Sequence, residues 1–173
     1  MKIELLINDT VFTTIETTTP ELEFATYKEM FLELTGWREQ PPVLPTLDEL
    51  KQQKYIEMSA SCANAITAGF VSSCSGQAVK YDSDKDTQLT MQGIALNVNS
   101  PIFASKYPNG CPVRGYVGDS TTKTVQWLNA EQVLALLADL SDHIGQCKQK
   151  GWGIQASIEA CLTVAEVEAI EWI

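Results

Sequence analysis

The spacing of apolar residues divides the chain into segments with different periods. Residues 2–7 (KIELLI) and 11–15 (VFTTI) are short runs rich in apolar and β-branched residues, which are typical of strands. Asn8 and Asp9 lie between them and tolerate the positive φ that a tight hairpin needs. The sequence therefore predicts a β-hairpin in its first 16 residues.

A helix is expected after this hairpin. Thr19 and Pro20 form a cap residue followed by proline at the first helical position. Four apolar residues then repeat at steps of three and four, which is typical of an amphipathic helix: Phe24, Tyr27, Phe31 and Leu34. We expect the helix to end near Gly36.

Residues 41–45 (PPVLP) predict a stiff, extended connector of the polyproline kind. We therefore expect residues 1–40 to form a small attachment module of one hairpin and one helix, and residues 46–173 to form a helical domain. A module of roughly 40 residues is too small to be comfortably stable alone, so it is expected to pack on another protein surface.

The second domain is predicted to open with a long helix. Thr46 and Glu49 form a capping box, and Gly69 is a natural stop for a helix that runs to about Ala68. The apolar residues of this helix have heptad spacing: Tyr55, Met58, Cys62, Ala65 and Ile66.

The middle of the chain is predicted to alternate short strands and one helix. Residues 70–81 fit a short hairpin, and the aspartates of residues 82–86 are expected to cap a helix over 87–98. Residues 99–120 are expected to be irregular, although 113–117 is predicted to pair with a strand at 121–127 across a Gly-Asp turn.

The last third has the most regular pattern. Asn129 and Gln132 form another capping box, and nine residues then alternate steps of four and three without a break: Val133, Leu137, Leu140, Ile144, Cys147, Gly151, Ile154, Ile158 and Cys161. This stripe predicts a long helix or a helical hairpin, and we expect it to support a homo-oligomer unless the domain covers it with its own core.

Two glycines interrupt that helix, so we expect a bend there or the close approach of a partner backbone. These are Gly151 and Gly153.

A capped short helix is predicted to follow from Thr163, and the ring of Trp172 is expected to anchor it. The predicted class is α+β and helix-dominated.

Charge excludes several functions. The 173 residues contain 12 basic and 22 acidic side chains, a formal net charge of -10, which opposes binding to nucleic acids or anionic membranes. No apolar run approaches the roughly 20 residues that cross a bilayer, and the first residues lack the pattern of a signal peptide. We therefore expect the protein to stay in the cytoplasm where it is made.

The five cysteines are predicted to be structural thiols, because their number is odd and no CxxC motif occurs: Cys62, Cys74, Cys111, Cys147 and Cys161. His143 and Cys147 are four residues apart, a legal spacing for two zinc ligands, but no second pair completes a site. We interpret them as a core cysteine beside an ordinary histidine.

Two other motifs resemble known sites only in part. Asp82, Asp84 and Asp86 resemble the start of a calcium-binding EF-hand loop, but Thr87 and Gly93 stand where that loop needs glycine and glutamate. Residues 115–118 (GYVG) with Lys123 have the wrong spacing for a phosphate-binding loop. We therefore assign no catalytic, cofactor-binding or metal-binding residues.

From about residue 48 to residue 173 the chain resembles a domain of unknown function that is common in bacteriophage tail genes. The motifs that carry the resemblance are spaced along the chain in order: CANAITAGFVSS at 62–73, YDSD at 81–84, DTQL at 86–89, Trp127, NAEQV at 129–133, His143 and TVAEVEAIEW at 163–172. The family often forms the end of tail-fibre or tail-fibre-associated proteins and carries no assigned functional residues.

The resemblance implies a non-enzymatic tail component of a phage, prophage or tailocin. With about 45 residues before the domain, a short structural or adaptor protein at the baseplate or fibre junction fits better than a whole fibre, and its partners would be other tail proteins. One alternative is a tail-fibre assembly chaperone that acts in the cytoplasm. A remoter alternative is a small hydrolase of cell-wall or capsule polymers, which would need two converging carboxylates.

Overall fold

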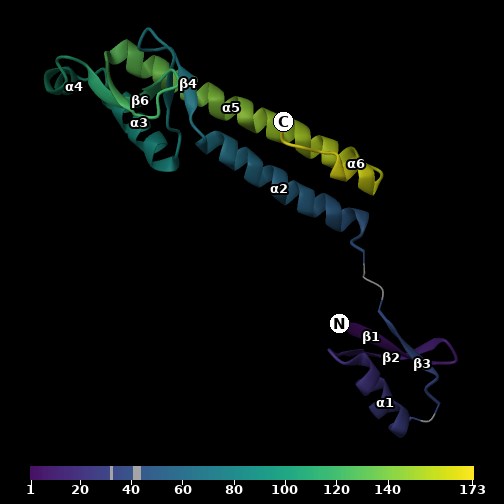
Figure 1. The fold of residues 1–173 in the computed structure, drawn as a ribbon. Helices are drawn as coiled ribbons and strands as arrows, with labels where there is room; N and C mark the ends of the chain where they lie inside the picture. Colours follow the sequence, from purple (N-terminus) through teal and green to yellow (C-terminus); the bar gives the residue numbers. More distant parts are fainter. Residues whose placement is uncertain (32, 41–43) are drawn as a thin grey trace. The chain divides into compact units, whose positions relative to one another are not determined.

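A computed structural model describes residues 1–31, 33–40 and 44–173. The chain divides into two compact units, Met1–Pro45 and Thr46–Ile173 (Figure 1). Both mix helices with small antiparallel sheets, so the predicted helix-dominated α+β class is confirmed. Of the expected connector at residues 41–45, positions 41–43 lie outside the described residues.

The N-terminal unit is a three-stranded antiparallel sheet with one helix. Strand β1 (Lys2–Ile7) lies between β2 (Thr10–Glu16) and β3 (Gly36–Glu39), and helix α1 spans Pro20–Met30. Asn8 and Asp9 join β1 to β2 with φ values of 48° and 64°, which confirms the predicted hairpin. Its small core contains Ile3, Leu5 and Leu34.

Helix α1 ends earlier than the sequence predicts, and β3 was not expected. The chain leaves helical geometry at Phe31 (φ -127°, ψ 89°). Leu34 is buried as predicted, but it reaches the core from a loop, and the next residues extend as β3 so that Trp37 pairs with Leu5. The unit gains backbone hydrogen bonds along β1 in this way, which a longer helix could not provide. Thr19 occupies the predicted cap position without a side-chain capping bond.

The C-terminal unit is built on two long antiparallel helices, α2 (Leu47–Thr67) and α5 (Ala130–Ala160) (Figure 1). Lys51 near the start of α2 donates to the carbonyl oxygen of Glu159 near the end of α5, at 3.0 Å. We call this pair, over α2 and the second half of α5, the arm. The capping boxes predicted for both helices are present, and so is the one that begins the short helix α6 (Val164–Glu168).

The chain between α2 and α5 forms the head of this unit. Its sheet has the order β4-β5-β6-β7, with all neighbouring strands antiparallel. The strands are β4 (Phe70–Ser72), β5 (Val79–Tyr81), β6 (Cys111–Val117) and β7 (Thr124–Leu128), and the helices are α3 (Lys85–Asn97) and α4 (Pro101–Lys106).

Both predicted hairpins of the head are confirmed, but the expectation of an irregular 99–120 is wrong. Ser100 caps α4 by accepting from the backbone N–H of Phe103 at 3.1 Å. Strand β6 begins at Cys111, which is buried, although Pro112 follows it. Proline lacks an N–H for the ladder and is rare inside strands, so Pro112 hides the start of β6 from sequence analysis.

The head core lies between the sheet, α3 and the first half of α5. Its buried members are Phe70, Val79, Tyr81, Met91, Val98, Cys111, Leu128, Val133, Leu136 and Leu140. Burial raises the pKa of Tyr81 to about 12, so this phenol stays neutral at physiological pH. The apolar stripe of α5 is thus used inside the unit, by the head at its start and by α2 farther along.

Two of the three glycines of α5, Gly151 and Gly153, play different roles in one uninterrupted helix. A Cβ added at Gly151 would lie 3.3 Å from Cys62 Sγ on α2 and 3.9 Å from Trp172 Cζ3. The close approach at Gly151 is therefore made by the side chains of Cys62 and Trp172, and not by the expected partner backbone. A Cβ added at Gly153 would meet no atom within 4 Å.

These surroundings predict opposite effects for the two positions. Gly153→Ala should stabilise the protein by about 0.5–1 kcal/mol, because alanine costs less backbone entropy in a helix. Gly151→Leu should destabilise it by about 1–3 kcal/mol, because the side chain would collide with Cys62 and Trp172. Urea unfolding of both variants measures these changes, and a Gly151→Leu variant as stable as the wild type would refute the close packing.

Candidate functional site

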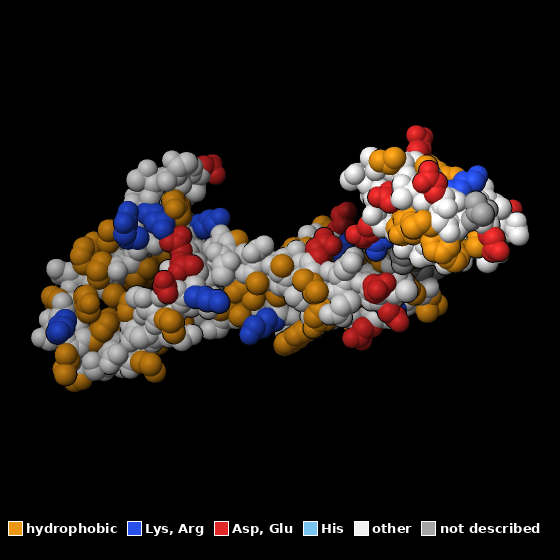
Figure 2. All heavy atoms as spheres, turned by 90° about the horizontal axis from the view of Figure 1, so that it is seen from below, with side chains coloured by type: hydrophobic (Ala, Val, Ile, Leu, Met, Phe, Trp, Pro, Cys, Tyr) orange, Lys and Arg blue, Asp and Glu red, His pale blue; other side chains and the backbone are white. Residues whose placement is uncertain are grey.

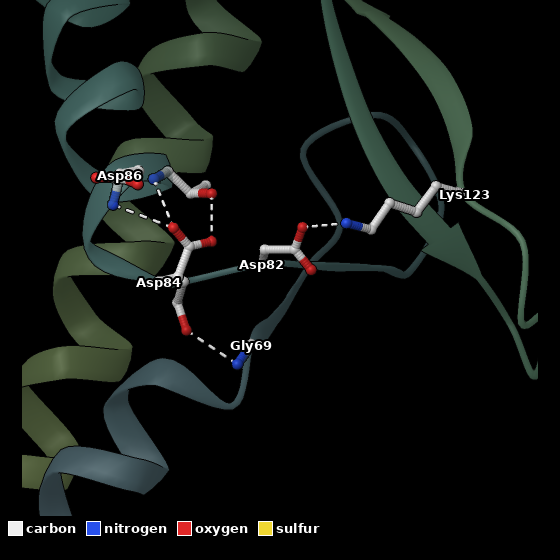
Figure 3. Close-up of polar contacts among 7 residues, drawn as sticks. Gly69, Asp82, Asp84, Asp86 and Lys123 are labelled. Atoms are coloured by element: carbon white, nitrogen blue, oxygen red, sulfur yellow. Dashed lines mark hydrogen bonds and ion pairs between the residues drawn. The ribbon is translucent and has the colours of Figure 1, made fainter.

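The acidic loop between β5 and α3 is organised around Asp84 (Figure 3). One carboxylate oxygen of Asp84 accepts from the backbone N–H groups of Asp86 and Thr87, both at 3.0 Å, and the other accepts from Thr87 Oγ1 at 2.5 Å. The bonds from Thr87 hold the pKa of Asp84 below its ordinary value. Asp84 is therefore the N-cap of α3, as predicted for this aspartate run.

Asp82 points away from that cap and forms an ion pair with Lys123, which lies just before β7 (Figure 3). Hydrogen bonding to Asp82 raises the pKa of Lys123. The Lys123 ammonium also lies 5.2 Å from the centre of the Tyr116 ring on β6. The ion pair thus joins two motifs that lie far apart in the sequence, the aspartate run at 82–86 and Lys123, which follows the GYVG turn at 115–118.

The glycines of that hairpin serve the fold. Gly118 has a φ of +56° in the turn, and a Cβ at Gly115 would collide with Val79 on the neighbouring strand. A hollow of about 360 Å³ lies beside the hairpin, with Met91, Ile94 and Val113 among its apolar residues. Its polar residues are Asp82, Asp86, Thr87, Thr90, Arg114 and Lys123. Both signs of charge face this hollow.

A second polar hollow, of about 410 Å³, lies where β4 meets α5. Ser72 Oγ donates to Asp139 Oδ2 at 2.5 Å and accepts from the backbone N–H of Cys74 at 3.1 Å. Asp142 lines the same hollow and accepts from Gln146 Nε2 at 2.6 Å. Ser72 and Asp139 were not singled out from the sequence, because nothing local connects residues 67 positions apart.

His143 and Cys147 do not combine as metal ligands. His143 donates from Nε2 to the carbonyl oxygen of Ala65 at 3.2 Å, and its ring stacks on Phe70. The backbone oxygen of Cys147 accepts from Cys62 Sγ at 3.4 Å. Within the described residues, no group of three or more His, Cys, Asp or Glu side chains is arranged to hold a metal ion.

All five cysteines are free thiols. Burial raises the pKa of Cys111 and of Cys147, which keeps these sulfurs protonated and poorly nucleophilic. The raised pKa values of these two thiols agree with the predicted structural role.

Apolar side chains reach the surface in several places, and Figure 2 shows some of them along the helices. On the arm they include Tyr55, Ile56 and Trp152. On the head, Leu96 and Leu134 line a shallow apolar hollow of about 370 Å³ between α3 and α5. No helix in the described part of the chain combines the length and apolar character needed to span a membrane.

These features define a mixed α+β protein with a two-helix arm, a small sheet-containing head and a separate N-terminal sheet unit. Residues 49–172 match the family described as a domain of unknown function, DUF4376, and the chain belongs to this family. The predicted extent of 48–173 agrees with that match. The chain shows no significant similarity to any curated protein or to any solved structure.

The cap at Asp84 predicts a pH-dependent contribution to stability. Because folding lowers the pKa of Asp84, its contribution is present above the unfolded pKa, near 4, and is lost as the pH falls through the lower folded value. Asp84→Ala should therefore lower the melting temperature at pH 7, by a margin that shrinks below about pH 4.

Calorimetry between pH 2 and 7 measures this margin. Asp119→Ala, which removes an exposed aspartate from the turn between β6 and β7, controls for the loss of one negative charge. A margin for Asp84→Ala that stays constant down to pH 2 would contradict the assignment of Asp84 as a charged cap.

Proposed function

We propose that the chain is a non-enzymatic structural or adaptor component of a phage, prophage or tailocin tail, at the baseplate or tail-fibre junction. It would be made in the cytoplasm of the bacterial host and carried in the virion, bound to other tail, fibre or baseplate proteins. The proposal starts from the resemblance of residues 48–173 to a domain common in phage tail genes. Features of both units support a role in holding proteins together.

The observation that carries the proposal is the apolar surface of the small N-terminal unit. Phe12 on β2 lies against Phe31, which directly follows α1, with 5.2 Å between the ring centres. Their exposed fractions are 45% and 43%, and neighbouring Met30 is also exposed. Large apolar groups are costly to leave in water, and such patches on small units commonly mark protein contacts.

The small size of this unit and its sheet edges favour the same interpretation. Only a few residues form its core, so burying the patch made by Phe12, Met30 and Phe31 on a partner would add substantially to its stability. Strand β2 lies at one edge of the sheet and β3 at the other, which leaves backbone groups able to pair with a partner strand. We propose that this unit attaches the chain to its partner.

Two alternatives differ in what they require. A tail-fibre assembly chaperone would use the same patch in the cytoplasm and leave before the particle is finished. A small polymer hydrolase would use Asp139 and Asp142, which line one hollow. In the structure each carboxylate accepts a hydrogen bond from a neighbouring side chain of the protein, Ser72 or Gln146. The hydrolase therefore has weaker support than the adaptor.

The test is the protein content of particles purified from the bacterium that carries the gene. We expect mass spectrometry to detect the chain in amounts comparable to other tail proteins. Phe12→Glu should reduce its incorporation by about tenfold or more, because a charge in the centre of an apolar contact is strongly unfavourable.

Leu22→Glu is the matched control, because Leu22 is exposed on α1 but, by helical spacing, faces away from Tyr27 and its neighbour Phe31. This variant should be incorporated normally. A chain that is abundant in the cytoplasm but missing from particles would overturn the structural role and favour the chaperone. Particles whose polymer degradation is abolished by Asp139→Asn would favour the hydrolase.

A further inference from the structure

The two broad sides of the arm differ in what covers them. On one side the C-terminal segment returns over the helices: Trp172 lies against Gly151, and the Lys150 ammonium is 4.9 Å from the centre of the Trp172 ring. Helix α6 packs on α2 on this side, and Val167 is fully buried there. Lys54 of α2, although charged, is only 16% exposed.

The opposite side of the arm is not covered by any other element of the C-terminal unit. Successive residues of an α-helix are rotated by about 100° about the helix axis. Measured from the buried residue Met58 of α2, Lys54 and Tyr55 lie on opposite sides, and Lys54 is on the covered side. On α5, Gly151 faces α2, and the same rotation puts Lys150 on the covered side and Trp152 on the opposite side. Because the helices are antiparallel, Tyr55 and Trp152 share one side, which we call the open face.

Large apolar side chains are left in water on this open face. Tyr55 is 41% exposed and Trp152 is 62% exposed. Ile56, at the border of the face, is 61% exposed. A pair of helices can bury only the seam between them, and two further helices laid on the open face would complete a four-helix arrangement.

Charge on the open face is sparse, and of the charged residues of α2, helical spacing places only Asp48, in the first turn, on this face. Between Gln52 and Thr67, the only charged residues of α2 are Lys54 and Glu57, which pair with each other at 3.1 Å. On α5, helical spacing places two exposed charged residues on the open face, Lys148 and Glu159. They have opposite sign and are about 16 Å apart along the helix, at nearly the same angle around it.

This spacing makes the face complementary to itself. A two-fold axis that crosses the arm midway between Lys148 and Glu159, beside Trp152, would stack α5 on α5 in opposite directions. Each Lys148 would then face Glu159 of the other copy, and the two Trp152 rings would lie close to the axis. A contact in which each copy uses the same patch is the usual form of a two-fold dimer.

The size of the face suits such a dimer. A helix of 21 residues is about 30 Å long, and two packed helices are about 20 Å wide. A face of this size buries roughly 600 Å² on each copy, or about 1,200 Å² in total, which lies at the lower end for specific interfaces. We propose that a second copy of this chain docks on the open face, arm against arm and antiparallel.

The test uses the purified full-length chain alone, so its result does not depend on any place in a phage particle. Sedimentation equilibrium should show a dimer at micromolar concentration. Trp152→Glu should raise the dissociation constant by about 30-fold or more, because it places charges next to each other at the axis. Leu96→Glu, at an 87% exposed apolar residue on α3, is the matched control and should leave the dissociation constant unchanged.

A charge exchange separates loss of the interface from loss of the fold. Lys148→Glu should weaken the dimer by placing like charges opposite each other, and the double variant Lys148→Glu, Glu159→Lys should restore it to within about threefold. Circular dichroism should be the same for all variants. A wild-type chain that stays monomeric at 100-fold higher concentration, a dimer unaffected by Trp152→Glu, or a double variant as weak as the single one would overturn the proposal.

Discussion

The close pairing of α2 with α5 is the contact on which the C-terminal unit depends. The two helices are brought together where α5 has no side chain, at Gly151, and where α2 presents the small Cys62. Hydrogen bonds join α2 to α5 near both ends of α2, from Lys51 to the carbonyl oxygen of Glu159 and from His143 to that of Ala65. This pair positions both the head, which connects the end of α2 to the start of α5, and the C-terminal segment, which follows the end of α5.

Local signals were the most predictable part of the structure. Capping boxes at Thr46, Asn129 and Thr163 each mark a real helix start, because the reciprocal bonds involve residues only three apart. The Asn8-Asp9 turn is equally local. Strand β3 was missed because its formation depends on partners in β1 that lie 30 to 36 positions away, and the sequence GWRE has no periodic pattern of its own.

The polar contacts of the head show the same division. The capping role of Asp84 could be predicted, because its partners lie two and three residues farther along. The pairs Asp82–Lys123 and Ser72–Asp139 could not, since each joins residues that meet only after the sheet and α5 have assembled. The heptad stripe of α5 was predicted correctly as a pattern, but its use within the unit depends on α2, which the pattern alone does not specify.

The order of elements also affects how the C-terminal unit can fold. The arm is made of one helix from before the head and one from after it, so the head is an insertion between the two halves of the arm. Closing that long loop has an entropic cost, which is lower once the head has formed and holds its own ends near each other. Contacts between segments so distant in sequence also slow folding. The arm should therefore assemble after the head has folded. Substitutions that destabilise the head core should also weaken the pairing of α2 with α5 at the end of the arm farthest from the head.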